Sequence, residues 1–203
     1  MASIYDLKPK FQALLRPLAG ALHKAAVTPN QVTMAALVGS LLVGLLSVKS
    51  LENRYWLLLL PLWLFLRMAL NAIDGIIAKE FNLKSNAGAL LNELGDVISD
   101  VFLFLPLAMV RPDAAWAVIA FTMGAILSEF CGVLGQALGG KRHYEGPMGK
   151  SDRAFLIGVV ALGSTCFPLV MDWWAYVFWA AFVLVLWTCR NRIVCAFKEL
   201  KNA

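Results

Sequence analysis

Residues 55–79 read YWLLLLPLWLFLRMALNAIDGIIAK, a run long enough to cross a bilayer that ends beside a carboxylate, Asp74. About 20 predominantly apolar residues span the hydrocarbon core. Asn71 lies one turn before Asp74 and on the same helix face, and Gly75 and Ala78 add small side chains beside it. An ionisable side chain inside a membrane is costly and is typical of a functional site. This stretch therefore predicts a membrane helix that carries a site.

The composition indicates that the bilayer is the solvent of this chain. Of its 203 residues, 60% are hydrophobic and only 15% are charged, and the mean hydropathy is +0.71. A soluble domain of this length cannot bury so much apolar surface. We therefore expect an all-α membrane protein that binds membrane lipids and no nucleic acid. The four cysteines lack metal-ligand spacing, so we interpret them as reduced, small apolar side chains.

Six apolar windows of about 20 residues predict six transmembrane helices within one domain, 1–203. Residues 1–25 have apolar side chains at helical spacing with Lys and Arg among them, which predicts an amphipathic helix in the headgroup layer. A helix packed on the protein itself is the alternative. The bundle covers 31–189 and a cytoplasmic tail covers 190–203. The predicted spans are 31–49, 55–79, 88–110, 114–138, 154–171 and 173–189.

The loops predict the orientation, because cytoplasmic loops carry an excess of Lys and Arg. Six spans place both termini on one side, and that side holds fourteen basic residues against three on the other. We therefore expect cytoplasmic termini in a bacterial inner membrane, with the 71–79 stretch just under the cytoplasmic surface. The fourteen are Lys8, Lys10, Arg16, Lys24, Lys79, Lys84, Lys141, Arg142, Lys150, Arg153, Arg190, Arg192, Lys198 and Lys201; the three are Lys49, Arg54 and Arg111.

The second and third helices form a hairpin around a short loop centred between residues 83 and 84. Residues equidistant from that centre lie at similar depth, so Asn71 is level with Asp96, and Arg67 is level with Asp100. We interpret Arg67 and Asp100 as an ion pair that braces the two helices, with substrate contact as the alternative.

Two amides and two carboxylates are expected to converge within about one turn of this hairpin: Asn71, Asp74, Asn92 and Asp96. Asp74 is also level with Glu93. Carboxylates at that depth need a cation. Oxygen ligands without His or Cys favour a hard ion such as Mg²⁺, Mn²⁺ or Ca²⁺.

The spacing resembles that of the CDP-alcohol phosphatidyltransferase family, whose pattern is D-x2-D-G-x2-A-R-x8-G-x3-D-x3-D. This chain reads N-x2-D-G-x2-A-K-x8-G-x3-N-x3-D over residues 71–96, with every gap matched. The first and third Asp are Asn here, and Arg is Lys. The stretches TPNQVT (28–33) and GKSDR (149–153) extend the resemblance over nearly the whole chain, which looks like the bacterial YnbA-type branch.

The resemblance implies phospholipid synthesis by metal-dependent transfer of a phosphatidyl group from CDP-diacylglycerol to an alcohol, with release of CMP. By motif position, Asp96 matches the general base, and Mg²⁺ or Mn²⁺ is the expected ion. The family also implies a homodimer. The implied metal ligands are Asn71, Asp74, Asn92 and Asp96, and the implied nucleotide-binding residues are Asp74, Gly75, Ala78, Lys79 and Gly88.

Four further residues are candidates for binding the acceptor or a phosphate. Lys150 and Arg153 open a helix on the cytoplasmic side, where cations and a helix N-terminus favour phosphate; charges that only set topology are the alternative. Glu93 is either an extra metal ligand or directed at a neighbouring helix. Glu129 lines an acceptor pocket or pairs with Arg67. Lys141, Arg142 and His143 are interpreted as loop charges beside lipid headgroups.

Two other functions remain open from the sequence. A degenerate homologue would bind CDP-lipid or lipid without turnover, because two Asp are missing. A CDP-alcohol:diacylglycerol phosphotransferase would use the same motif with donor and acceptor exchanged. A small transporter is disfavoured, because no inverted repeat is visible. The acceptor alcohol cannot be read from the sequence.

Overall fold

The structure is a computed structural model that describes residues 4–201, with side chains from residue 11 onward. This part of the chain is helical, without strands. The α-helices are α1 (Ile4–Lys24), α2 (Pro29–Ser47), α3 (Leu59–Glu80), α4 (Asn86–Phe104), α5 (Leu107–Val110), α6 (Ala115–Ala137), α7 (Lys150–Cys166) and α8 (Trp174–Lys201). Four 3-10 turns join them: η1 (Val48–Leu51), η2 (Arg54–Leu58), η3 (Pro112–Ala114) and η4 (Pro168–Trp173).

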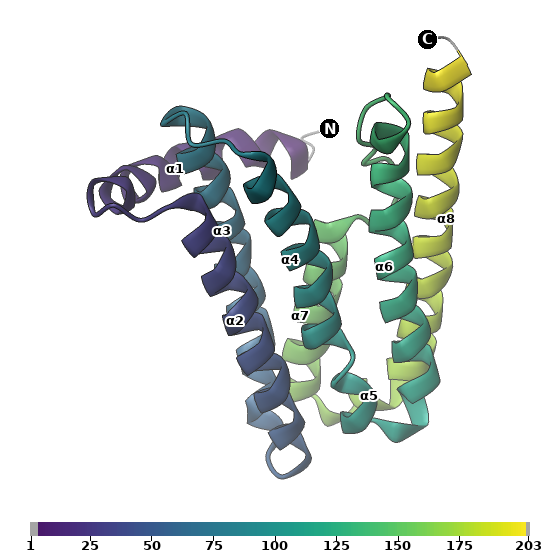
Figure 1. Ribbon diagram of the computed structural model, residues 1–203. Coiled ribbons are helices and arrows are strands. Elements are labelled where there is room, and N and C mark those ends of the chain that lie inside the picture. Colours follow the sequence, from purple (N-terminus) through teal and green to yellow (C-terminus); the bar gives the residue numbers. More distant parts are fainter. Residues whose placement is uncertain (1–3, 202–203) are drawn as a thin grey trace.

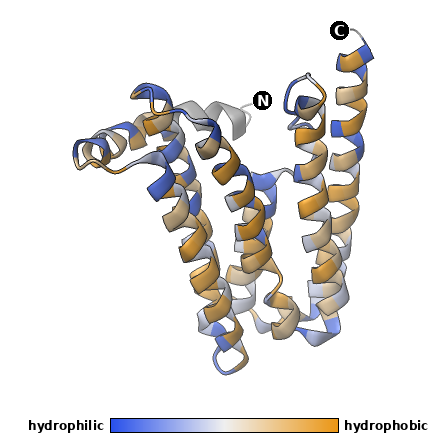
Figure 2. Ribbon diagram, in the orientation of Figure 1, coloured by the Kyte–Doolittle hydropathy of each residue, from blue (hydrophilic) through white to orange (hydrophobic). Residues whose placement is uncertain are grey.

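Six long helices, α2, α3, α4, α6, α7 and α8, run alongside one another as a bundle (Figure 1). Apolar residues cover much of the length of the bundle, and hydrophilic residues gather in the connections at its two ends (Figure 2). The all-α membrane fold predicted from the sequence is therefore confirmed.

Four of these helical segments are long and apolar enough to cross a membrane: Pro29–Leu51, Arg54–Glu80, Pro112–Ala137 and Pro168–Lys201. Helix α4 carries three acidic residues, Glu93, Asp96 and Asp100, and α7 has only 17 residues. Both lie among the four apolar helices in the bundle. Six spans therefore remain a prediction for this chain.

Helix α1 lies across the end of the bundle where α3 ends (Figure 1). Ala19 is buried, and Leu15 and Leu22 pack with it against isoleucines of α3. Leu14 and Leu18 remain exposed, Leu14 by 75% of its surface. One apolar stripe of this helix therefore packs on the protein, as the alternative expected. The exposed stripe is compatible with the headgroup layer, which stays a prediction.

Helix boundaries follow capping and proline chemistry. Thr28 and Gln31 form the expected capping box, with the Thr28 N–H donating to Gln31 Oε1 at 2.8 Å. Ser85 caps α4 by accepting from the Gly88 N–H at 3.0 Å. The predicted helix 88–110 is interrupted at Pro106, which lacks an N–H and separates α4 from α5.

Three predicted helix boundaries in the last third of the chain are wrong. Helix α7 begins at Lys150 rather than 154 and ends at Cys166, two residues before Pro168, because the residue before a proline avoids helical geometry. Helix α8 continues to Lys201, so the predicted tail 190–203 is helical as far as the structure describes it. This extension brings the 190–201 segment alongside α6 and its following loop.

Small residues set the closest helix approaches. At Gly44 of α2, an added Cβ would overlap the backbone carbonyl of Phe102 on α4. Gly124 of α6 packs against Phe182 and Val185 of α8. Close approach through small residues is the usual way in which helices associate in lipid.

All four cysteines are free thiols, as predicted, and Cys131 and Cys189 are buried.

Helices α3 and α4 are braced by the predicted ion pair. Arg67 Nη1 lies 2.6 Å from Asp100 Oδ1, and both side chains are buried. Arg67 Nη2 also donates to the Asp96 carbonyl at 3.0 Å. The equal-depth argument is confirmed for this pair, because a short hairpin loop fixes the register of the two helices.

The fourteen-to-three count of basic residues includes charges that have partners inside the protein. Arg142, Lys150, Arg153 and Arg192 all contact carboxylates. Arg16 pairs with Glu80 on the same side, and Arg111 pairs with Asp113 and Asp172 on the other. When all six are left out, nine basic residues are counted against two, so the asymmetry persists. At the opposite end of the bundle, exposed Tyr55, Trp116, Trp173 and Tyr176 resemble an interfacial aromatic belt.

The first prediction concerns sidedness. In a background with Cys166 and Cys195, the two cysteines that are not buried, replaced by serine, Lys84→Cys should react with an impermeant thiol reagent only after the membrane is opened. Glu52→Cys, in the exposed turn at the other end of the bundle, is the matched control and should react in intact cells. The reverse labelling pattern would overturn the predicted orientation.

The second prediction concerns the brace. Arg67→Met and Asp100→Leu should each lower the unfolding temperature in detergent, because each removes the shortest ion-pair contact of a buried charge. Loss of all pairing costs about 3–5 kcal/mol, and each loss should be smaller than that because Asp100 keeps Arg153 and Arg67 keeps Asp96. The double variant should be more stable than the sum of the two losses predicts. Arg153, the other partner of Asp100, keeps Glu129 in that variant. Additive losses would show that the two residues act separately.

Candidate functional site

Asp96 lies at the centre of the predicted cluster and is 17% exposed. Asn71 Nδ2 donates to Asp96 Oδ1 at 3.0 Å, as their equal depth predicts. Lys150, the first residue of α7, forms an ion pair with the same oxygen. Arg67 Nη2 adds a weaker contact at 3.4 Å. Three donors on α3 and α7 therefore hold one carboxylate oxygen of Asp96, while its second oxygen has no described hydrogen bond.

Asp74 is held by a different helix. Thr33 of α2 donates from Oγ1 to Asp74 Oδ2 at 2.8 Å, and Asp74 is buried. Glu93, expected at the depth of Asp74, instead forms an ion pair with Arg142. Thr33 was not singled out from the sequence, although it ends the TPNQVT motif. Asp74 and Asp96 are thus oriented by separate sets of neighbours.

Glu129 has three cationic partners, more than any other acid of the site. Its carboxylate lies 2.9 Å from Arg142 Nη2, 2.9 Å from Arg153 Nη2 and 3.4 Å from Arg192 Nη1. The alternative pairing with Arg67 is wrong, because Arg67 is bound by Asp100. Glu129 therefore joins α6, α7, α8 and the loop before α7.

Arg153 is fully buried and makes only internal contacts. It lies 3.1 Å from Asp100 Oδ2, and its Nη1 donates to Ser128 Oγ at 2.9 Å. With Glu129 as a third partner, Arg153 connects the two acidic centres Asp100 and Glu129. Lys150, by contrast, keeps 31% of its side chain exposed. The two cations that open α7 therefore have different surroundings.

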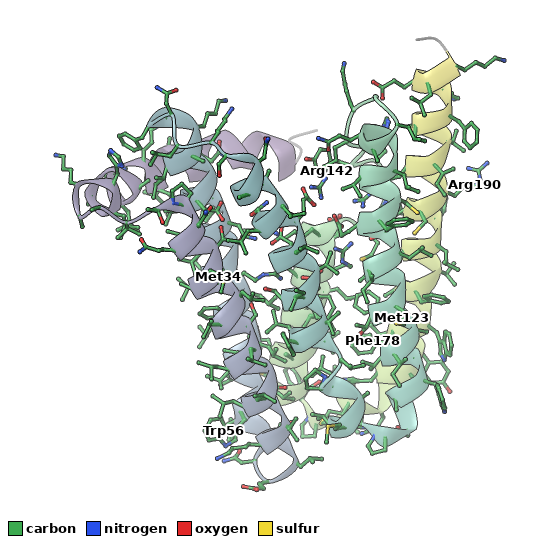
Figure 3. The ribbon with its side chains drawn as sticks, viewed as in Figure 1. Met34, Trp56, Met123, Arg142, Phe178 and Arg190 are labelled. Atoms are coloured by element: carbon green, nitrogen blue, oxygen red, sulfur yellow. The ribbon has the colours of Figure 1, made fainter. Side chains whose placement is uncertain are left out.

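Sequence reasoning missed Arg142 and Arg192 as members of the site. Arg142 lies on the loop after α6, near the ends of α4 and α6 (Figure 3). Arg192 is buried and donates to the Ser128 carbonyl at 2.5 Å, whereas Arg190 projects from α8 away from the bundle (Figure 3). Ending the sixth helix at 189 concealed the signal, because Arg192 continues the buried face of α8 at helical spacing after Thr188.

The residues implied for nucleotide binding are distributed over two places. Gly75 and Lys79 line a depression of about 230 Å³ between α1 and α3, together with Gln12, Arg16, Ile76 and Glu80. An added Cβ at Gly75 would meet no atom within 4 Å. Gly88 packs against Asn30 of α2, where a Cβ would come 2.9 Å from Asn30 Oδ1. Ala78 and Asn92 are partly buried.

The donor set around Asp96 fits a hard divalent cation. Asn71, Asp74, Asn92 and Asp96 offer oxygen atoms alone. Asp74 and Asp96 each retain one carboxylate oxygen without a described partner. Oxygen donors suit Mg²⁺ and Mn²⁺ rather than zinc. The amides lower the negative charge of the set without removing its ligand atoms.

Opposite charges are balanced in number across the site. Eight ion-pair contacts link its acidic and basic side chains, which explains how they are tolerated inside the bundle. Asp74 completes the set without an ion pair among these contacts. The acids are Asp74, Glu93, Asp96, Asp100 and Glu129; the bases are Arg67, Arg142, Lys150, Arg153 and Arg192.

Solved structures share this fold. The phosphatidylinositol phosphate synthase PgsA1 of Mycobacterium tuberculosis, in a crystal structure with CDP-DAG bound, has a TM-score of 0.76 and 21% sequence identity, with 91% of this chain and 94% of that chain covered. Its structure in complex with manganese and citrate has the same TM-score and covers 89% and 88%. At this identity the likeness shows the fold alone.

Sequence relatives identify the family. The inner membrane protein YnbA of Escherichia coli K12 is 47% identical over 190 residues, which are 94% of each chain. An uncharacterised protein of Aquifex aeolicus is 40% identical over 104 residues, about half of each chain. Residues 26–187 match the pattern of the CDP-alcohol phosphatidyltransferases. The chain therefore belongs to the CDP-alcohol phosphatidyltransferase family.

Proposed function

We propose that this protein is an active phosphatidyltransferase that uses CDP-diacylglycerol as donor and an alcohol as acceptor in phospholipid synthesis. The observation that carries the proposal is Asp96: it occupies the base position of the family motif, remains partly exposed and keeps one carboxylate oxygen free of described partners. Family membership and the CDP-DAG bound by a protein of the same fold support the donor.

Asp96 acts as general base in this proposal. The acceptor oxygen forms a bond to the phosphorus that carries the diacylglycerol, the bond from that phosphorus to the CMP oxygen breaks, and the proton of the alcohol passes to Asp96. Asn71 and Lys150 fix the Asp96 carboxylate through its other oxygen. A positioned base of this kind contributes about 10²–10⁴-fold to a rate.

The donor is expected to bind across α2, α3 and α4. Asn71, Asp74, Asn92 and Asp96 would hold Mg²⁺ or Mn²⁺, which when bound neutralises pyrophosphate charge. The open backbone at Gly75 leaves room for the nucleotide, and Lys79 stands beside it in the depression between α1 and α3. We propose that the nucleotide is bound by Asp74, Gly75, Ala78, Lys79 and Gly88.

The proposed acceptor residues divide into two groups. Lys150 is exposed enough to meet a phosphate, and Glu93 is partly exposed beside Arg142. Arg153 and Glu129 are buried and paired with each other. We therefore propose that they do not touch the acceptor and instead hold Lys150 and helices α6 and α8 in position.

The proposal places the site and both termini at the cytoplasmic face of a bacterial inner membrane. When the basic residues with described carboxylate partners are left out, the excess is nine to two, and it supports this orientation. YnbA, an inner membrane protein by name, supports the location. A homodimer is proposed from the family alone.

Two alternatives come from the motif itself. A degenerate homologue that binds CDP-lipid without turnover is favoured by the Asn residues at 71 and 92. A CDP-alcohol:diacylglycerol phosphotransferase would release CMP from a different donor. Assays with CDP-diacylglycerol plus candidate alcohols, and with CDP-alcohols plus diacylglycerol, separate both from the proposed enzyme.

The third prediction tests activity. Purified protein with CDP-diacylglycerol, Mg²⁺ and a panel of alcohols should release CMP, and Asp96→Asn should lower the rate by about 10²-fold or more because the base is lost. Asp172→Asn, at the exposed end opposite the site, is the matched control and should retain the rate. No CMP with any acceptor, despite donor binding, would favour the degenerate homologue.

The fourth prediction concerns the number of metal ions. Two acids, Asp74 and Asp96, offset one divalent charge, so titration of Mn²⁺ without donor should reveal one tight site by electron paramagnetic resonance. The double variant Asn71→Asp with Asn92→Asp should add a second, since it restores two negative charges. Two tight Mn²⁺ sites in the unmodified protein would contradict this charge argument and leave the enzyme assignment intact.

A further inference from the structure

A second group of metal-ligating side chains lies outside the proposed site, where the loop after α6 meets the end of α8. His143 and Glu145 of this loop and Cys195 of α8 each offer a ligand atom, and these atoms lie within 4.8 Å of one another. In a tetrahedral zinc site with bonds of about 2.0–2.3 Å, ligand atoms are about 3.3–3.8 Å apart. Small side-chain rotations would bring the three atoms to those separations.

His143 is oriented in the manner of a metal ligand. Its ring is buried, Nδ1 lies 3.3 Å from Glu145 Oε1, and Nε2 lies 3.0 Å from Glu199 Oε2. Nε2 is inaccessible to solvent and makes no well-formed hydrogen bond among the described residues. A carboxylate beside the second ring nitrogen is the usual outer-shell partner of a metal-bound histidine.

The backbone around His143 holds the ring in place. The His143 N–H donates to the Gly132 carbonyl at 2.9 Å, and the Lys141 N–H donates to Glu199 Oε2 at 3.2 Å. An added Cβ at Gly135 would come 2.9 Å from His143 Cδ2, so the ring lies directly on the glycine face of α6. Two glycines of α6 thus make room for this histidine.

The other two ligands are in suitable chemical states. Glu145 lies on the loop with 48% of its side chain exposed, so its carboxylate can turn toward an ion beside His143. Cys195 is a free, partly exposed thiol, and the cytoplasmic side proposed for it keeps thiols reduced. A nitrogen, a sulfur and an oxygen ligand together suit Zn²⁺ better than Mg²⁺.

We propose that His143 Nδ1, the Glu145 carboxylate and the Cys195 thiolate bind one Zn²⁺ ion, with water as the fourth ligand and Glu199 supporting His143. The ion ties the loop after α6 to α8. Arg142, next to His143 in the chain, pairs with Glu93 and Glu129. The zinc site therefore holds the loop that supplies a cation to the phosphatidyltransferase site, and it is chemically distinct from that site.

Cobalt is the probe for this site, because a thiolate ligand gives Co²⁺ a charge-transfer band that oxygen ligands do not give. Full-length protein in detergent, freed of metal by a chelator and kept reduced without added thiols, should bind one equivalent of Co²⁺ with that band. Zn²⁺ should abolish the band and excess Mg²⁺ should not. Cys195→Ser should lose the band, and His143→Gln and Glu145→Gln should each weaken Co²⁺ binding at least tenfold.

Matched controls separate this site from the rest of the protein. Cys166→Ser, His23→Gln and Asp74→Asn should retain the band, because these residues lie outside the group. Zn²⁺ should raise the unfolding temperature of the unmodified protein but not of Cys195→Ser. Absence of the band in correctly folded unmodified protein, or its persistence in Cys195→Ser, would overturn the proposal. Neither result depends on whether CMP is released.

Discussion

The neutralisation of Glu129 is the interaction on which the rest of the site depends. A carboxylate inside a membrane bundle is costly unless cations surround it. Here the cations come from three places in the chain: the loop before α7, the first turn of α7, and α8. Leucine-rich helix faces pack in several registers with similar energy in lipid. Charge pairs at one depth select among those registers, so the same contacts that neutralise Glu129 also fix how α6, α7 and α8 meet.

Along helix α4, the acidic side chains become more exposed from the interior of the bundle toward its end. Asp100 is buried and bound by Arg67 and Arg153, Asp96 is partly exposed, and Glu93, one turn further toward the end of the bundle, is 34% exposed. The first turn of α7 follows the same gradient, because Arg153 serves the buried acids and Lys150 reaches Asp96. The first turn of α7 thus provides a buried cation, Arg153, that supports the site and an accessible cation, Lys150. Asp96 lies where the buried and the accessible parts of the site meet.

The sequence predicted those contacts that a short hairpin determines. Arg67 with Asp100 and Asn71 with Asp96 follow from equal distance to one loop centre, and both contacts are present. The partners of Glu129 could not be derived in this way, because they depend on how helices distant in the chain pack. Arg192 was hidden by the underestimated length of α8. Thr33, the partner of Asp74, lies on α2, outside the hairpin whose geometry could be reasoned about.

The balance of acidic and basic side chains in the site gives a physical reason for the two amides at positions 71 and 92. Five acidic and five basic side chains make up the cluster around Asp96 and Glu129, so the fixed charges of this cluster cancel before any ligand binds. Aspartate at both positions would leave two negative charges in excess, close to Asp74 and Asp96, and only bound cations would relieve their repulsion at this depth. With asparagine, the folded bundle has no such requirement. The site can then remain ordered without metal, because Asn71 itself donates a hydrogen bond to Asp96 that a carboxylate at position 71 would replace with repulsion.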